Sequence, residues 1–125
     1  TYLPYTATYT IPTSKLNFMH SPPSYSANTA RASLLKKIGS YMFACTHRVD
    51  YATLNAANGE RYEVWANGWV GDLKKYDETV FKFMKGHADW THCAAMVDII
   101  DGEHFVQQMK FSNYRTVYNG ILDEG

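Results

Sequence analysis

The stretch MVDIIDGEHFVQQM, residues 96–109, constrains the fold of this chain more than any other segment. Asp101-Gly102 is a preferred two-residue turn, because these residue types tolerate the positive φ angles that a tight hairpin requires. Apolar and β-branched residues flank the turn on both sides. We therefore expect an antiparallel hairpin with strands at 95–100 and 103–111.

A single clear helix is expected further upstream, over residues 27–38. Six side chains there recur at the three- and four-residue spacing of one helix face: Ala27, Ala30, Arg31, Leu34, Leu35 and Ile38. Ser24 or Ser26 can cap the start of this helix, and Gly39 suits a left-handed stop at its end.

Two further segments have the composition of strands, residues 41–47 and 61–66. Alternation in the first places four side chains on one face: Tyr41, Phe43, Cys45 and His47. The turn sequence NAANGE precedes the second segment. Residues 1–12 are typical of an N-terminal strand or hairpin, the stretch RTVYNGI of a last strand, and the type of the insertion at 68–93 is open.

These elements predict an α+β fold in one domain that spans residues 1–125. The helix would pack on an antiparallel sheet. The strands of that sheet would be 41–47, 61–66, 95–100 and 103–111.

Composition limits the classes of function. The formal net charge is zero, which argues against a general polyanion binder, since backbone phosphates are held by clustered Lys and Arg. A small local basic patch stays open. No apolar run approaches the roughly 18 to 20 residues of a membrane helix, so no membrane partner is expected.

Glu63 stands in an unexpected place, inside the aromatic and β-branched run GERYEVW. If neighbouring strands bring His47 onto the same face, the two side chains could act as acid and base in phosphodiester transesterification. The alternative is two unrelated polar residues on the wet face of a sheet. Spacing alone favours this second interpretation.

The order of these motifs resembles the small secreted fungal ribonucleases of the guanyl-specific type. Those enzymes carry a catalytic His in a Tyr-Pro-His-Lys-Tyr strand, which Cys-Thr-His-Arg-Val around His47 loosely matches. Their catalytic base lies in Tyr-Tyr-Glu-Trp/Phe-Pro, and Arg-Tyr-Glu-Val-Trp places Glu63 there. The resemblance covers roughly residues 24–112 and implies a microbial ribonuclease-like fold.

Two positions depart from this family. Its phosphate-binding Arg falls on Met96 here, and its catalytic acid His falls on Phe111. Without that cation and that acid, the charge that develops in the transition state is not neutralised. The resemblance therefore implies a pseudoenzyme in which His47 and Glu63 are vestigial. An active guanyl-preferring secreted endoribonuclease that uses Glu63 and His47 is the alternative.

A ribonuclease-like sheet without its chemistry is similar to the RNase-like proteins associated with haustoria, which powdery mildew fungi secrete. That resemblance implies a virulence or avirulence effector, secreted from the fungus and acting in the host cell cytoplasm. Its partners would be host plant proteins, with recognition by intracellular leucine-rich-repeat (NLR) immune receptors, and RNA binding would be weak. Many members carry an N-terminal Tyr-x-Cys and a C-terminal Cys, both missing here.

The segment HADWTHC, residues 87–93, contains four possible zinc or copper ligands: His87, Asp89, His92 and Cys93. A closed structural site normally draws ligands from two segments, and only the distant His104 could add one. We expect no metal and no other cofactor. The segment would then be a polar loop with a buried Trp90.

The two cysteines, Cys45 and Cys93, leave two states open. A disulfide requires α-carbons about 4.4 to 6.8 Å apart, whereas positions one strand removed lie roughly 9 to 10 Å apart. A bond would need the insertion to fold back, and buried free thiols are the alternative.

Three tryptophans cluster near the second strand and the insertion, Trp65, Trp69 and Trp90. Tryptophan is enriched among the residues that dominate binding energy at protein interfaces. Trp65 shares a strand face with Arg61 and Glu63, which predicts that it is exposed. We expect Arg61, Trp65, Trp69 and Trp90 to form a binding surface, with the protein core as the alternative for the tryptophans.

Overall fold

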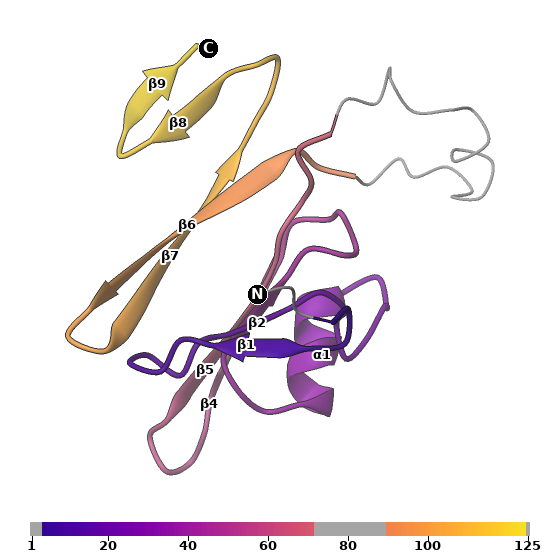
Figure 1. Ribbon diagram of the computed structural model, residues 1–125, viewed down its shortest axis with the longest axis vertical. Helices are drawn as coiled ribbons and strands as arrows, with labels where there is room; N and C mark the ends of the chain where they lie inside the picture. The colour runs from indigo at the N-terminus through magenta and orange to yellow at the C-terminus, as the bar shows by residue number, and fades with distance from the viewer. Residues whose placement is uncertain (1–3, 72–89, 125) are drawn as a thin grey trace.

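The computed structural model describes residues 4–71 and 90–124 and has an α+β fold, as predicted. One helix packs on one face of a five-stranded sheet, and a long hairpin covers the other face (Figure 1). A second, short hairpin ends the described chain.

The central sheet is mixed, and its strand order is β1-β2-β3-β5-β4. The β1–β2 and β4–β5 pairs are antiparallel, whereas β3 is parallel to both β2 and β5. The bounds are β1 Thr8–Thr10, β2 Asn17–Met19, β3 Tyr41–Phe43, β4 Asp50–Asn55 and β5 Arg61–Ala66.

The predicted hairpin is confirmed, with β6 at Cys93–Ile100 and β7 at Glu103–Lys110. Asp101 and Gly102 have φ angles of 51° and 85°, as the tight turn between twisted strands requires. A similar turn at Asn119-Gly120 joins β8 (Thr116–Tyr118) to β9 (Ile121–Asp123). The predicted last strand is thus a hairpin.

The prediction of a single antiparallel sheet is wrong in two respects. Strand β4 was not predicted. It lies between β3 and β5 in the chain and runs antiparallel to β5, so β3 and β5 run parallel to each other. The β6–β7 hairpin forms a sheet of its own and is not hydrogen-bonded to β5 as a further strand. It packs face to face on the sheet instead.

The helix α1 spans Thr29–Lys36, two residues shorter at each end than predicted. Ala30 and Leu34 are buried against Phe43, Val64 and other residues of β3, β4 and β5. Leu35 is 61% exposed, and Ile38 is also exposed.

The buried face of α1 includes polar residues that periodicity did not predict. Thr29 and Ser33 are buried, and the hydroxyl groups of both donate to the carbonyl oxygen of Ser24. The start of α1 is held by Asp50 of β4, whose Oδ2 accepts from the Ala30 N–H at 2.8 Å. No side chain caps the helix at Asn28, so the prediction of a serine cap is wrong.

The opposite face of the sheet carries a second core. Leu16, Met42 and Trp65 are buried there under residues of the hairpin, including Val97 and Val106. Gln108 of β7 links the hairpin to the central sheet by hydrogen bonds. Its Nε2 donates to the carbonyl oxygen of Ala66 at 2.8 Å and to Oδ1 of Asn67 at 2.9 Å.

Candidate functional site

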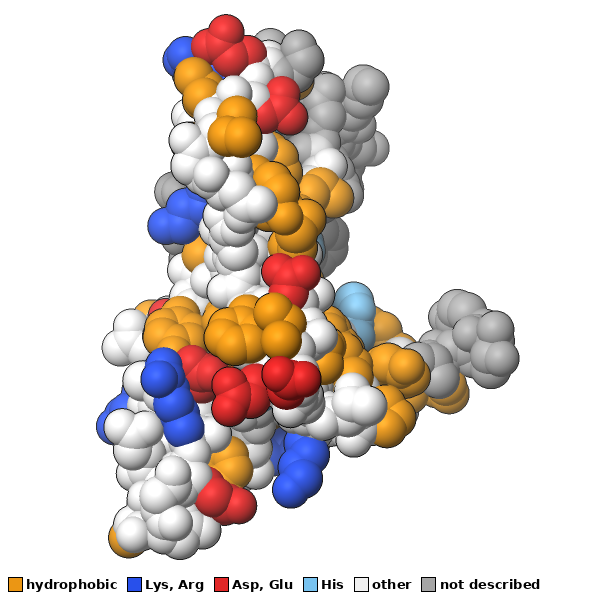
Figure 2. All heavy atoms as spheres, turned by 90° about the vertical axis from the view of Figure 1, so that its left-hand side faces the viewer, with side chains coloured by type: hydrophobic (Ala, Val, Ile, Leu, Met, Phe, Trp, Pro, Cys, Tyr) orange, Lys and Arg blue, Asp and Glu red, His pale blue; other side chains and the backbone are white. Residues whose placement is uncertain are grey.

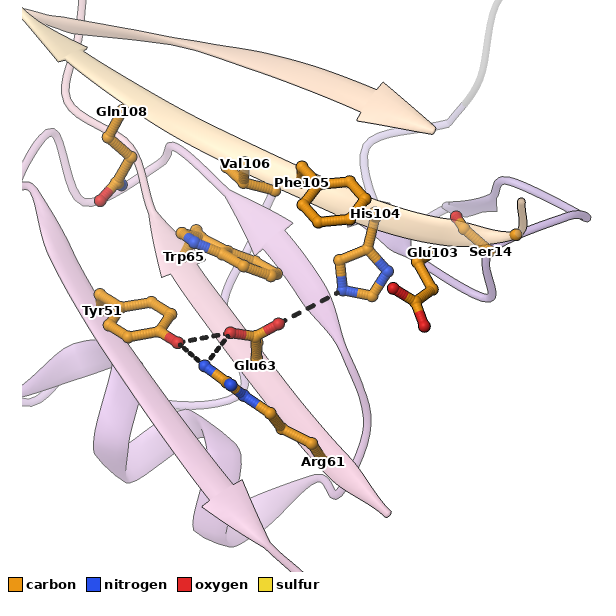
Figure 3. A pocket seen from close by; sticks show the side chains of 11 residues that line it. Ser14, Tyr51, Arg61, Glu63, Trp65, Glu103, His104, Phe105, Val106 and Gln108 are labelled. Atoms are coloured by element: carbon orange, nitrogen blue, oxygen red, sulfur yellow. Dashed lines mark hydrogen bonds and ion pairs between the residues drawn. The ribbon is translucent and has the colours of Figure 1, made fainter. Parts of the chain in front are cut away.

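An open groove of about 800 Å³ lies where the β7 end of the hairpin meets the β4–β5 part of the sheet. Its walls come from β4, β5 and β7, with the β6–β7 turn at one end (Figure 3). The residues with functional groups that line it are Ser14, Tyr51, Arg61, Glu63, Trp65, Glu103, His104 and Gln108.

Glu63 is central among the polar groups of this groove. Its Oε1 accepts a hydrogen bond from the Tyr51 hydroxyl at 2.5 Å and one from Nη2 of Arg61 at 2.9 Å. The same Arg61 nitrogen lies 3.2 Å from the Tyr51 oxygen, so the three groups form a closed triangle. Antiparallel pairing of β4 and β5 produces this arrangement, because it sets Tyr51 beside Trp65, two residues along from Glu63 on the same face.

His104 approaches the same carboxylate from the hairpin. Its Nε2 is buried, has no hydrogen-bond partner and lies 3.8 Å from Oε2 of Glu63. Its ring meets the Trp65 ring edge-on, with centroids 5.5 Å apart. Packing of the hairpin on the sheet thus brings together two residues that are forty-one positions apart in the chain.

The charges in the groove are largely paired. The hydroxyl of Tyr51 and then the carboxylate of Glu63 raise the pKa of Arg61. The Arg61 side chain is nevertheless 60% exposed, whereas that of Glu63 is mostly buried. The guanidinium therefore stands at the rim, and the carboxylate lies deeper.

The structure does not support the hypothesis of a His47–Glu63 pair, because His47 lies beyond the end of β3 and packs against Trp69 and Trp90. Strand β3 ends at Phe43, and His47 lies in the following turn with φ 57°. Its ring packs edge-on against Trp90, with centroids 4.2 Å apart, and stacks on Trp69 at 5.7 Å. Burial, followed by the nearby His20, lowers the pKa of His47.

The two positions that the resemblance marks as replaced do not line the groove. Met96 lies on β6 opposite Gln107. Phe111 follows β7, where its backbone N–H donates to the carbonyl oxygen of His92 at 3.0 Å. The cation and the imidazole beside Glu63 are instead Arg61 and His104.

The prediction of an exposed tryptophan surface is wrong for two of the three residues. Trp65 is buried because the hairpin covers its face of the sheet, and Trp69 is buried in a ring cluster with His47, Trp90 and His92. Trp90 is half-buried. Of the four predicted surface residues, Arg61 is the one that is exposed and also lines the groove.

Both cysteines are free thiols. Of the two states that the sequence left open, the structure therefore has no Cys45–Cys93 disulfide. Cys93 is buried, and this burial raises the pKa of its thiol. Cys45 is half-buried, with its Sγ 3.6 Å from the hydroxyl oxygen of Tyr5.

Of the candidate metal ligands, His87 and Asp89 lie outside the described residues. The Nε2 of His92 is 2.8 Å from the carbonyl oxygen of Gly71. Among residues 4–71 and 90–124, no group of three or more His, Cys, Asp or Glu side chains could hold a metal ion. Within the same ranges, no helix is long and apolar enough to cross a membrane.

Sequence reasoning missed Tyr51 and His104, which complete the site around Glu63. The alternation of β4 was a usable signal for Tyr51, since VDYATLN follows a turn and precedes another. No local sequence pattern indicated that His104 would lie beside Glu63. Comparison with known proteins found no matching family model, no matching curated protein and no matching solved structure.

Proposed function

We propose that this chain acts by binding a partner in the groove and does not catalyse a reaction there. The observation that supports this is the state of Glu63. One of its carboxylate oxygens accepts from Tyr51 and Arg61, and the other faces His104 at 3.8 Å. Both oxygens of the Glu63 carboxylate are thus already in contact with neighbouring side chains of the groove.

The spacing of this pair disfavours phosphodiester cleavage. In an in-line displacement, the base and the acid stand on opposite sides of the phosphorus. Two hydrogen bonds of about 2.7 Å, plus the attacking and leaving oxygens between them, require roughly 8 Å from base to acid. Glu63 and His104 lie at about half that distance, so a phosphate does not fit between them as the groove stands.

The biological setting of this proposal comes from the resemblance alone. A helix, a strand with Glu63 and a hairpin follow one another as in guanyl-specific ribonucleases and in the haustoria-associated proteins of powdery mildew fungi. We extend the proposal accordingly to a secreted fungal effector with a ribonuclease-like fold. It would bind host plant proteins and be open to recognition by NLR receptors.

The first test is RNA cleavage. We expect the purified protein to release no more 2′,3′-cyclic phosphate from RNA than its Glu63→Gln variant does, because acid and base cannot bracket the phosphorus. The measurement is detection of the cyclic product over a matched time course. Guanyl-preferring cleavage that disappears in Glu63→Gln would refute the binding proposal.

An active ribonuclease is the second candidate, since Tyr51, Arg61, Glu63 and His104 converge in one groove. In that case the acid would be His104 and not the His47 that the sequence suggested. Loss of cleavage in His104→Gln, with His47→Asn unaffected, would identify this arrangement.

Binding is tested by co-purification from plant extract. We expect a partner that the parent protein retains to be lost when Phe105, on the groove wall, is changed to Arg. The matched control is Val117→Arg, because Val117 is similarly exposed but lies on the separate β8–β9 hairpin.

A further inference from the structure

We propose that the groove receives a positively charged side chain, a lysine or an arginine, carried on an extended segment of a partner protein. This inference rests on the proposed binding function and specifies the chemistry of the partner. It is carried by the charges and the aromatic walls of the groove.

The charge of the groove is negative. Two carboxylates line it, Glu63 and Glu103, against one guanidinium, that of Arg61. Arg61 is already engaged with Glu63 and Tyr51, so its charge is offset within the protein. Figure 3 shows Glu63 and Glu103 on either side of His104, and both residues line the groove. The Glu103 side chain is exposed and has no hydrogen-bond or ion-pair partner among residues 4–71 and 90–124, which leaves its charge available to a ligand.

The walls of the groove suit a cation as well. Two aromatic residues that line the groove are partly exposed, Tyr51 at 44% and Phe105 at 51%, and a third, Trp65, is buried. A cation beside an aromatic face is attracted by the ring quadrupole. The aliphatic stem of a Lys or Arg side chain can also cover the apolar parts of such walls. Figure 2 shows acidic side chains beside hydrophobic ones near the middle of the face that it presents, with Lys or Arg side chains next to them.

A phosphate group fits the same groove poorly. Anion recognition draws on cationic or N–H donors that are free to bind, and the single guanidinium here already donates to Glu63. Two carboxylates would also repel the phosphate. The volume of about 800 Å³ exceeds what one side chain fills, so a segment of several residues matches it better than an isolated amino acid.

The experiment uses the peptide acetyl-Gly-Arg-Gly-amide and a twin in which citrulline replaces arginine and removes the charge. Inorganic phosphate is the third probe. The readout is the NMR shift of the Trp65 indole N–H and of the Gln108 side-chain amide, followed by titration. We expect the arginine peptide to bind at least about three-fold more tightly than the citrulline twin, the gain typical of a partly exposed charge pair.

Two substitutions at exposed positions should change the affinity for the arginine peptide in opposite directions. Glu103→Gln should weaken binding of the arginine peptide about three-fold, since it removes a groove carboxylate. Arg61→Gln should strengthen it, since it frees Glu63. A phosphate site predicts the opposite sign for both variants. The matched control is Glu124→Gln, which changes the net charge equally just after the end of β9 and should leave binding unchanged.

Equal affinity for the two peptides, no binding of either, or the phosphate pattern of signs would each overturn this inference. Those results would contradict the cationic partner but not the proposed binding function, as long as RNA is not cleaved. RNA cleavage that depends on Glu63 would contradict the binding function itself, so the two proposals are tested separately.

Discussion

His47 has an environment that favours its neutral form. Burial between Trp69 and Trp90, together with the charge of His20, lowers the pKa of His47. The unfolded chain therefore takes up a proton at His47 at a higher pH than the folded chain does. Stability is then complete above the unfolded pKa of about 6.5 and declines as the pH falls through it.

This predicts a change in pH dependence when the residue is replaced. We expect the free energy of unfolding to rise between pH 5 and pH 7 more steeply in the parent than in His47→Asn. Asparagine tolerates the positive φ of this turn, so the variant removes the titration without adding backbone strain. Urea unfolding at pH 5, 6 and 7 measures the slopes, and equal slopes would contradict the assignment.

At the scale of elements, α1 depends on a narrow buried contact. Leu34 is fully buried against the sheet, whereas its neighbour Leu35 is 61% exposed. We expect Leu34→Asp to lower the free energy of unfolding by several kcal/mol, because it buries a charge without a partner. Leu35→Asp serves as the matched control and should cost less than about 1 kcal/mol. Chemical denaturation of both variants decides the point, and similar losses would show that the two faces of α1 are equivalent.

The β6–β7 hairpin is held to the sheet by Gln108 as well as by apolar contacts. Gln108→Ala leaves two acceptors, the Ala66 carbonyl oxygen and Asn67 Oδ1, without their donor. We expect a loss of about 1 to 3 kcal/mol in the free energy of unfolding. The neighbouring Gln107 is exposed on the other face of the same strand, so Gln107→Ala should be close to neutral. A thermal or urea melt of the pair checks this, and two equal losses would argue against the contact.

At the scale of the whole molecule, the central sheet belongs to two cores at once. Val64 packs on the helix side and Trp65 on the hairpin side, although they are adjacent in β5. The three layers should therefore unfold as one cooperative unit. We expect the most protected amides of β5, α1 and β7 to exchange with similar free energies of opening. Much faster exchange throughout β7 would mean that the hairpin opens separately.

The sequence by itself determined the local features of this protein. The helix near 29–36, strand β5 and the Asp101-Gly102 turn follow from periodicity and from the φ angles that particular residues accept. The position of Glu63 on the face opposite the helix follows from alternation in β5. Strand β4 and the Asn119-Gly120 turn carried comparable local signals and could have been predicted.

Only the tertiary structure decided how these elements meet. Whether the hairpin extends the sheet or covers it depends on the packing of Val97, Val106 and Trp65 and on the Gln108 contacts, which no local pattern encodes. That choice buries Trp65 and brings His104 to Glu63, while the turn after β3 takes His47 away to Trp69 and Trp90. Local conformation is set by neighbours in the chain, whereas the groove forms between segments some forty residues apart and depends on how their surfaces fit.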